Sequence, residues 1–349
     1  MITGMVKEPI FICAGEPSGD LYAGLLVKEL KKNNPNLRVY GIGGAEMQKS
    51  GVEVRKNYQG LGTFGFSAGI FSILKNYKIY QEIGKEMYRI RPKTFIALAY
   101  PGINLLLCKY AKKLGCRVYY FLPPQIWAWG VFRKYFIKKW VDKVISVFPF
   151  ECEFYKKQGI RTAYVENPLF EKLKKYNRND FNKRIGFMPG SRLSQIKRNL
   201  PLMIGLMKKI SKNKDAIEFD LILYSNSLEL TKEVAMTEEG GLKSPAPPFK
   251  IITEERYQVM KNCDLLITSS GTASFEAAIM NIPQIFFNRP SFFDYYIFRR
   301  FLKTREYNLA NLYFNKKIVP SFVSFNKNYI LQNLFASLLS HLGLGYPSV

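Results

Sequence analysis

Short apolar runs and amphipathic stretches alternate along most of the chain. Continuous apolar runs that end in glycine or proline are typical of strands buried on both faces of a parallel sheet. In the first half these runs predict strands at residues 10–13, 39–44, 94–99, 117–122 and 144–147. In the second half they predict strands at residues 185–188, 219–223, 249–252, 264–268 and 284–287.

Helical spacing follows many of these strands. After residues 10–13, the side chains Leu21, Leu25, Leu26 and Leu30 recur on one helix face. Repeated strand-then-helix order predicts an α/β fold with doubly wound parallel sheets.

A polar stretch rich in Lys and Asn at residues 171–183 separates two series of these units. Such composition is typical of a domain boundary. We therefore expect two facing Rossmann-like domains, residues 1–170 and residues 171–349, with a cleft between them. We also expect the C-terminal segment to cross back to the first domain.

Residues 61–80 combine large apolar side chains with glycines and lead into lysines. One interpretation is a buried hairpin or helix. The other is a loop and amphipathic helix that enter a membrane surface, because Phe and Ile flanked by Lys are typical of interfacial segments. The candidate membrane contacts are Phe64, Phe66, Ile70, Phe71 and Leu74.

The charge of the chain narrows the choice of partner. Lys and Arg number 52 against 27 Asp and Glu, so the net charge is +25, and aromatic residues make up 15%. A basic, aromatic surface fits nucleic acid, an anionic membrane or a phosphorylated substrate. The alternative is that the lysines only solvate ordinary surfaces.

Several chemistries are disfavoured by composition. The five cysteines form no CxxC pair, and His341 is the single histidine, so disulfides, a His-based triad and a histidine metal site are not expected. No apolar run reaches the roughly 18 to 20 residues of a membrane span, and no secretory signal is visible. We expect neither a metal nor a cofactor.

Two strand-to-helix turns in the second half carry candidate chemistry. Ser270-Gly271-Thr272 follows the strand at 264–268, and a helix continues after it. Free N–H groups at a helix start suit a diphosphate, and Glu276 is one turn away from them, within reach of a ribose. The alternative is an ordinary Ser/Thr helix cap.

The second turn is Gly190-Ser191-Arg192, which follows the strand at 185–188. The carboxyl ends of parallel strands converge on one crevice, and Arg192 suits bidentate contact with a phosphate. Diphosphate and ribose contacts together favour a nucleotide-sugar leaving group. Neither a DxD triplet nor a GxxxxGK[ST] loop is present.

Motifs along the whole chain extend this interpretation. They are Gly15-Glu-Pro-Ser-Gly-Asp20, Gly41-Ile-Gly-Gly44, Pro124-Gln-Ile-Trp-Ala-Trp129, Phe148-Pro-Phe-Glu151, Pro189-Gly-Ser-Arg192, Ser270-Gly-Thr272 with Glu276, and Leu309-Ala-Asn-Leu312. In this order they resemble the lipid-A-disaccharide synthase family, glycosyltransferases of the two-domain GT-B fold.

The resemblance implies an inverting transfer of 2,3-diacylglucosamine from its UDP form to 2,3-diacylglucosamine 1-phosphate. The products would be the β-1,6-linked lipid A disaccharide 1-phosphate and UDP. It also implies peripheral attachment to the anionic inner face of the inner membrane, with no nucleic acid partner.

The resemblance assigns roles residue by residue. The implied donor-binding residues are Ser191, Arg192, Ser270, Gly271, Thr272, Glu276 and Asn311. The implied acceptor-side residues are Ser18, Gly19, Asn104, Gln125, Trp127 and Trp129.

The sequence departs from the family pattern after the fourth strand. The family has Asp-Ala-Pro-Asp-x-Asn there, with its first Asp as the favoured catalytic base, and this chain has Ala99-Tyr-Pro-Gly102-Ile-Asn104. The candidate catalytic residues are therefore Glu16, Asp20 and Arg192, the last to assist departure of UDP.

Two smaller departures accompany this one. A Gly-His-Pro-like segment reads Glu166-Asn167-Pro168, and the terminal helices that brace the first domain are expected to be short. Two other functions stay open: an impaired or altered-substrate relative that binds UDP-sugar or lipid, and a nucleic-acid-binding protein.

Overall fold

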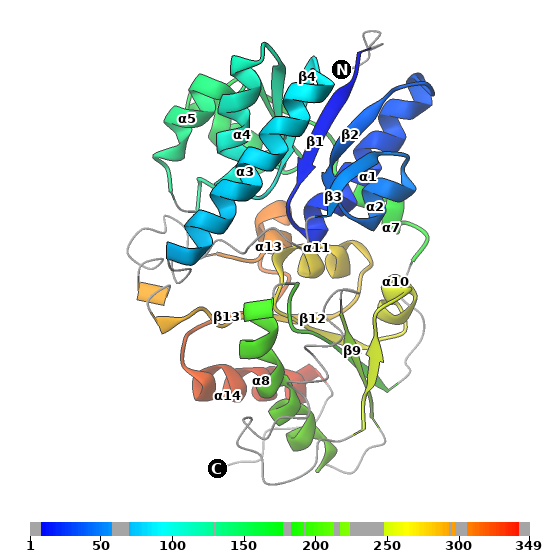
Figure 1. The fold of residues 1–349 in the computed structure, drawn as a ribbon. Helices are drawn as coiled ribbons and strands as arrows, with labels where there is room; N and C mark the ends of the chain where they lie inside the picture. The colour runs from blue at the N-terminus through cyan, green and yellow to red at the C-terminus, as the bar shows by residue number, and fades with distance from the viewer. Residues whose placement is uncertain are drawn as a thin grey trace. The chain divides into compact units, whose positions relative to one another are not determined.

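The computed structural model describes residues 8–57, 70–128, 130–176, 183–191, 193–212, 217–223, 248–292, 295–296 and 306–341. These residues divide into two compact units, each built around its own parallel sheet (Figure 1). Unit 1 comprises the described residues up to Pro168, and unit 2 comprises those from Leu169 onward.

Within its described residues, unit 1 contains a seven-stranded sheet in the order β3-β2-β1-β4-β5-β6-β7. The strands are β1 (Ile10–Ala14), β2 (Val39–Gly43), β3 (Glu53–Asn57), β4 (Thr94–Leu98), β5 (Arg117–Phe121), β6 (Lys143–Ser146) and β7 (Thr162–Tyr164). All pairs are parallel, and Ile10 of β1 lies opposite both Val39 and Thr94.

Helices cover both faces of this sheet. They are α1 (Pro17–Asn33), α2 (Ala45–Lys49), α3 (Ile70–Ile90), α4 (Pro101–Lys113), α5 (Arg133–Trp140) and α6 (Pro149–Lys157). Phe11 and Cys13 of β1 lie in a core cluster with residues of α3 to α6. Ile10 and Ile12 point to the opposite face and are equally buried, as expected for a strand between two helix layers.

Unit 2 contains, among its described residues, a six-stranded parallel sheet in the order β10-β9-β8-β11-β12-β13. The strands are β8 (Arg184–Met188), β9 (Glu218–Ile222), β10 (Lys250–Ile252), β11 (Leu265–Thr268), β12 (Gln284–Asn288) and β13 (Ser321–Val323). The helices are α7 (Leu169–Leu173), α8 (Leu193–Ser211), α10 (Arg256–Met260), α11 (Gly271–Ile279), α13 (Leu309–Phe314) and α14 (Lys327–His341).

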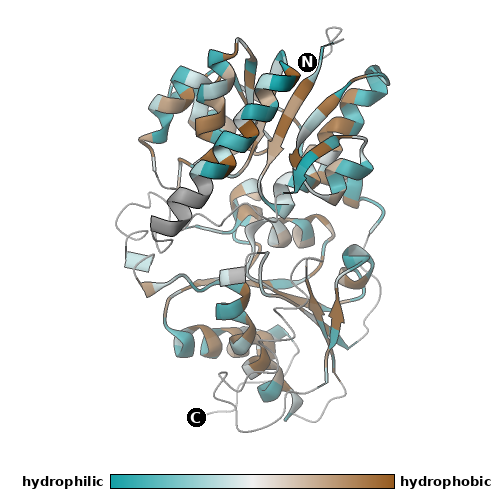
Figure 2. Ribbon diagram, in the orientation of Figure 1, coloured by the Kyte–Doolittle hydropathy of each residue, from teal (hydrophilic) through white to brown (hydrophobic). Residues whose placement is uncertain are grey.

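The core of unit 2 lies between the sheet and two long helices. Apolar residues of α8 and α14 pack in one cluster with residues of β8, β9, β11 and β12. Figure 2 shows the resulting pattern, with hydrophobic strands and helices that have one hydrophilic side. Among the described residues, no helix is both long and apolar enough to cross a membrane.

The predicted fold class, α/β with two doubly wound Rossmann-like domains, is confirmed by these sheets. Sequence reasoning missed the edge strands β3, β7 and β13. β3 has a mixed polar sequence with three exposed positions, and edge strands need no continuous apolar run because only one side of the strand is paired.

Both sheets have a topological switch point. In unit 1 the strand order reverses between β1 and β4, and in unit 2 it reverses between β8 and β11. Ligands of open α/β sheets bind beside the carboxyl ends of the strands at such points. The described turns that follow these four strands are residues 15–16, 99–100, 189–191 and 269–270, which adjoin the residues singled out in the sequence.

Candidate active site

The turn after β11 leads directly into α11. Ser270 has extended backbone angles, φ −118° and ψ 132°, and its side chain makes no capping hydrogen bond among the described residues. Ser269 is tied to the end of β8, because its Oγ donates to the Met188 carbonyl over 3.2 Å. The first N–H groups of a helix have no partner within it, so this end of α11 can accept an anion.

The turn after β8 requires a glycine. Gly190 has φ +122°, and a Cβ there would lie 2.7 Å from Gln195 Oε1. Asn199 of α8 is buried and donates to the Pro189 carbonyl over 2.8 Å, which holds the turn from the helix side. Ser191 follows this turn, half-buried, and Arg192 lies outside the described residues.

Glu276 is fully buried and already has two partners. Its Oε1 accepts hydrogen bonds from Arg256 Nη2 at 2.7 Å and from Tyr257 Oη at 2.9 Å, both on α10. Its Oε2 has no partner among the described residues. The carboxylate therefore keeps one acceptor atom for a further donor such as a ribose hydroxyl. Sequence reasoning missed both partners on α10.

Asn311 of α13 uses its amide inside the protein. Its Nδ2 donates to the Val319 carbonyl over 2.9 Å, and its Oδ1 accepts from the backbone N–H groups of Ile318 and Val319. Asn308 caps α13 and donates to Ser274 Oγ over 2.6 Å. Asn308 thus joins α13 to α11, and Asn311 joins α13 to the segment before β13. The predicted contact of Asn311 with the donor stays a prediction.

Asp20 of α1 has the contacts of a helix cap. Its two oxygens accept from three backbone N–H groups at the start of α2: Gly44 at 2.7 Å, Glu46 at 3.0 Å and Met47 at 3.1 Å. Burial raises the pKa of Asp20 above its usual value, and the three hydrogen bonds oppose this shift. The carboxylate joins α1 to α2, so it stabilises the fold whether or not it takes part in catalysis.

Glu16 lies at the carboxyl end of β1 and is only half-buried. It occupies the N-cap of α1 with extended angles, φ −145° and ψ 156°, and Pro17 begins the helix. Gly15 before it permits close packing, because a Cβ there would lie 2.4 Å from the Tyr100 ring. Ser18 and Gly19, in the first turn of α1, lie half-buried and buried respectively.

The chain after β4 adopts an uncommon backbone. Ala99 and Tyr100 both have positive φ, +47° and +43°, a left-handed conformation that costs energy for residues with a side chain. The Ala99 carbonyl accepts from Tyr120 Oη at 2.6 Å and from Asn104 Nδ2 at 3.0 Å. Asn104, which lies on α4, also donates to the Cys13 carbonyl, and this contact ties α4 to β1.

The same amide has one unused atom. Asn104 is fully buried and its Oδ1 has no partner among the described residues. The predicted contact of Asn104 with the acceptor substrate stays a prediction. Its Nδ2 stabilises the strained turn through the Ala99 carbonyl.

The loop after β5 carries the remaining predicted acceptor-side residues. Gln125 is exposed, Trp127 is 9% exposed, and Trp129 lies outside the described residues. Trp127 Nε1 donates to Glu151 Oε1 over 3.1 Å, so the loop is joined to α6.

The predicted membrane segment is described only in part. Phe64 and Phe66 lie outside the described residues. Ile70, Phe71 and Leu74 belong to the start of α3, so this stretch is helical, and their side chains are also outside the description. Membrane contact at these positions stays a prediction.

Comparison with known proteins decides the family. The family model described as lipid-A-disaccharide synthetase matches residues 10–342. Lipid-A-disaccharide synthase of Nitrosococcus oceani is 33% identical over 324 residues, covering 90% of this chain and 82% of the relative. Lipid-A-disaccharide synthase 1 of Legionella pneumophila strain Paris is 32% identical, with 92% and 85% covered. This chain belongs to the lipid-A-disaccharide synthase family.

Solved structures agree with this family in fold. UDP-GlcNAc 2-epimerase of Methanocaldococcus jannaschii, solved with UDP-GlcNAc and UDP, has a TM-score of 0.64 at 14% identity and covers 95% of this chain. UDP-GlcNAc 2-epimerase of Neisseria meningitidis, bound to UDP-GlcNAc, has a TM-score of 0.63 at 11% identity, with 97% covered. At such identities the likeness establishes the GT-B type of fold alone.

The family assignment confirms the predicted resemblance and the glycosyltransferase class. Two pairs of its motifs are joined by hydrogen bonds in this structure. Asp20 of the first motif binds Gly44 of the second, and Trp127 of the third binds Glu151 of the fourth. The motifs are therefore partly structural, which sequence spacing alone did not reveal.

Proposed function

We propose that this protein transfers 2,3-diacylglucosamine from UDP-2,3-diacylglucosamine to 2,3-diacylglucosamine 1-phosphate, with inversion, to give the β-1,6 lipid A disaccharide 1-phosphate and UDP. The observation that carries the proposal is the switch point of the unit 2 sheet in a chain of this family. At this switch point the Gly190 turn follows β8, and the start of α11 follows the neighbouring strand β11. Glu276 lies on α11 itself.

The donor contacts follow from these groups. The N–H groups at the start of α11, with Thr272 and Ser270, bind the diphosphate, and Ser191 and Arg192 bind it from the adjacent turn. Glu276 accepts from the ribose through Oε2, the oxygen without a partner among the described residues. That two epimerases of the same fold were solved with UDP-GlcNAc supports a UDP-sugar as the donor.

The acceptor hydroxyl must lose a proton, and Ala99 has no carboxylate to take it. We assign this step to Glu16, because it is half-buried at the carboxyl end of β1, which pairs with β4, the strand that Ala99 follows. A general base contributes roughly 10²–10⁴-fold to rate. Positive charge from Arg192 and the α11 dipole stabilises the UDP leaving group.

The experiment is a turnover assay with purified protein in detergent. Release of UDP from UDP-2,3-diacylglucosamine is expected only when 2,3-diacylglucosamine 1-phosphate is also supplied. Release that does not depend on the acceptor would contradict a transferase. Matched reactions with UDP-GlcNAc as donor test whether the acyl chains are needed.

A second candidate is a relative that binds UDP-sugar without turnover, and the absence of a carboxylate at Ala99 favours it. In that case UDP raises the midpoint of thermal unfolding while the assay above releases no UDP. The two candidates therefore differ in one measurement on the same sample.

Unit 1 also offers a surface that suits an anionic membrane. Phe132, Tyr135 and Phe136, at the start of α5, are 58%, 65% and 40% exposed. The sequences of α4 and α5 contain several Lys and Arg residues and neither Asp nor Glu. Exposed aromatic rings with surrounding cations are typical of helices at a lipid interface.

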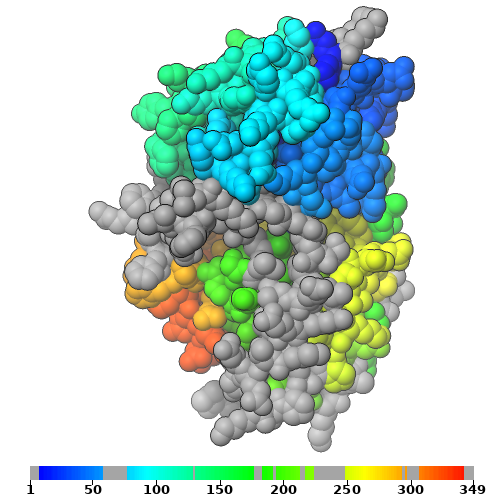
Figure 3. Space-filling model, viewed as in Figure 1, coloured from blue at the N-terminus to red at the C-terminus, as the bar shows by residue number. Residues whose placement is uncertain are grey.

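Contacts between these side chains keep rings and cations together. Lys134 Nζ lies 5.3 Å from the Tyr135 ring centroid, and Lys109 of α4 lies 5.6 Å from that of Trp140. In Figure 3 the α3 to α5 region, coloured cyan to green, forms part of the surface of unit 1 on this side, beside the blue N-terminal elements. We assign peripheral membrane contact to this surface together with the start of α3.

A further inference from the structure

A buried carboxylate lies beneath the loop after β5. Glu151, in the first turn of α6, is 3% exposed. Its Oε1 accepts from Trp127 Nε1 at 3.1 Å, and its Oε2 accepts from Ser146 Oγ at 2.6 Å. Both donors are neutral, so the carboxylate is held by hydrogen bonds and not by an ion pair with either of them.

The same helix holds the loop at a second point. Tyr155 Oη donates to the Pro124 carbonyl over 2.5 Å. Phe150 packs against the Trp127 ring edge-to-face, with centroids 5.1 Å apart. Residues 124–127 are therefore fixed to α6 by two hydrogen bonds and one aromatic contact, all within unit 1.

Fixing a loop does not require a carboxylate in the core. A buried carboxyl group is costly unless it is fully hydrogen-bonded, and an apolar side chain fills the same volume without that cost. Glu151 adds a directional hydrogen bond to Trp127. An acceptor placed at 3.1 Å sets the rotation of the Trp127 ring about its side-chain bonds, which apolar packing specifies less strictly.

Among the described residues, titratable groups that interact with Glu151 lie on α6. Cys152 and Tyr155 lie on its own helix, and Arg133 of α5 acts on Tyr155. Burial raises the pKa of Glu151 to about 7, and the bonds from Ser146 and Trp127 oppose that shift. The carboxyl group therefore changes its charge close to neutral pH.

We propose that Glu151 is a positioning residue for the acceptor: its carboxylate orients Trp127, and with it the loop after β5, for 2,3-diacylglucosamine 1-phosphate. The inference rests on the proposed function, which assigns this loop to the acceptor side. It adds a residue whose side chain acts through Trp127.

The contact itself is tested by NMR with the indole N–H of Trp127, assigned by its loss in Trp127→Phe. This resonance shifts in wild-type protein with a midpoint near pH 7, because ionisation of Glu151 strengthens the hydrogen bond. It does not titrate in Glu151→Gln. An indole N–H resonance of Trp127 that is the same in wild type and in Glu151→Leu would overturn the proposal.

Positioning is tested by equilibrium binding of 2,3-diacylglucosamine 1-phosphate in detergent micelles, which needs no turnover. Glu151→Leu, which cannot accept a hydrogen bond, weakens binding about tenfold or more. Glu151→Gln keeps an acceptor oxygen and recovers most of the affinity. UDP binds all variants equally.

The matched control is Glu153→Leu, an exposed carboxylate on the same helix, which leaves acceptor binding unchanged. Equal acceptor binding by wild type and Glu151→Leu overturns the proposal, as does a wild type that does not bind the acceptor. In both cases retained UDP binding leaves the donor half of the proposed function standing. Thermal unfolding confirms that each variant is folded.

Discussion

The guanidinium of Arg256 donates to the buried carboxylate of Glu276 over 2.7 Å, which joins α10 to α11. This pair gives the buried carboxylate of Glu276 a cationic partner. It also occupies Oε1 and leaves Oε2 for a ligand.

Arg256→Leu is therefore expected to weaken UDP binding about tenfold or more and to lower stability by about 3 kcal/mol, because it leaves a buried carboxylate without its cation. Glu276→Gln should weaken UDP binding with a smaller loss of stability. Calorimetry with UDP and urea unfolding measure the two effects. UDP affinity unchanged in both variants would remove Glu276 from the donor site.

Variants of Asp20 and Glu16 are expected to change different properties: the stability of the fold for Asp20 and kcat for Glu16. Asp20→Ala removes the acceptor for three N–H groups of α2 and should cost about 1–3 kcal/mol of stability. Glu16→Gln should keep stability and lower kcat by roughly 10²–10⁴-fold. Parallel urea unfolding and turnover measurements decide this, and Asp20→Asn with wild-type stability and a similar loss of kcat would reverse the roles.

Ala99 has a backbone that suits the residue it replaces. Its φ of +47° is left-handed, a region that Asp and Asn enter more readily than Ala. Ala99→Asp is expected to fold and to raise kcat, because it supplies a carboxylate at the position where the resemblance places the catalytic base. Ala99→Asn is the matched control, equal in backbone preference and without a base. A similar rise in both variants would point to relief of strain instead of catalysis.

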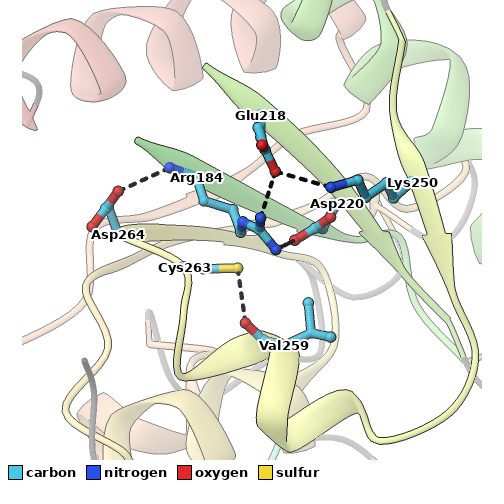
Figure 4. A network of polar contacts seen from close by, with 7 residues as sticks. All are labelled: Arg184, Glu218, Asp220, Lys250, Val259, Cys263 and Asp264. Carbon is cyan, nitrogen blue, oxygen red and sulfur yellow. Dashed lines mark hydrogen bonds and ion pairs between the residues drawn. The ribbon is translucent and has the colours of Figure 1, made fainter. Parts of the chain in front are cut away.

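A buried ion pair supports unit 2 at the opposite end of its sheet (Figure 4). Arg184 at the start of β8 contacts Asp220 at 3.3 Å and also Glu218, while Asp264 accepts from the Arg184 backbone N–H. Asp220 is fully buried, and burial raises its pKa although Arg184 opposes the shift.

Arg184→Leu should therefore cost about 2–3 kcal/mol, below the range for a fully buried pair because the Arg184 side chain is 24% exposed. The double variant Arg184→Leu with Asp220→Leu should recover much of that loss. Urea unfolding measures both, and UDP affinity should stay constant because Arg184 begins β8 and Asp220 lies in the middle of β9, away from the turns that follow β8 and β11. A double variant as unstable as the sum of the single variants would show that the two side chains do not interact.

The aromatic surface of α5 predicts a lipid-dependent interaction. Phe132→Ser with Tyr135→Ser should reduce co-sedimentation with vesicles of anionic lipid about tenfold or more, and vesicles of neutral lipid should bind wild type weakly. Turnover in detergent should be unchanged. Tyr164→Ser, an exposed tyrosine elsewhere on unit 1, is the matched control. Binding to duplex DNA that falls steeply with salt, without vesicle binding, would favour nucleic acid instead.

Much of the fold could be predicted from local pattern. Central strands of a parallel sheet are buried on both faces, so β1, β4, β8 and β11 are continuous apolar runs and were found at nearly their observed bounds. The edge strand β10 was predicted, because its short run is apolar. The edge strands β3, β7 and β13 were missed because they meet the sheet on one side only, and β3 has exposed Glu53 and Asn57. Their pairing depends on neighbours distant in sequence, which a local pattern does not contain.

The candidate site, like the fold, could be predicted from the sequence only in part. The sequence determined which turns follow the switch-point strands, because glycine, serine and an apolar run mark a strand-to-helix turn by local sterics and hydrogen bonding. Only the tertiary structure decided which polar atoms are already used. Asp20 and Asn311 have their oxygens engaged by backbone N–H groups, while Glu276 retains Oε2 for another donor. The physical reason is that a hydrogen bond depends on distance and direction between groups far apart in the chain, and folding alone brings them together.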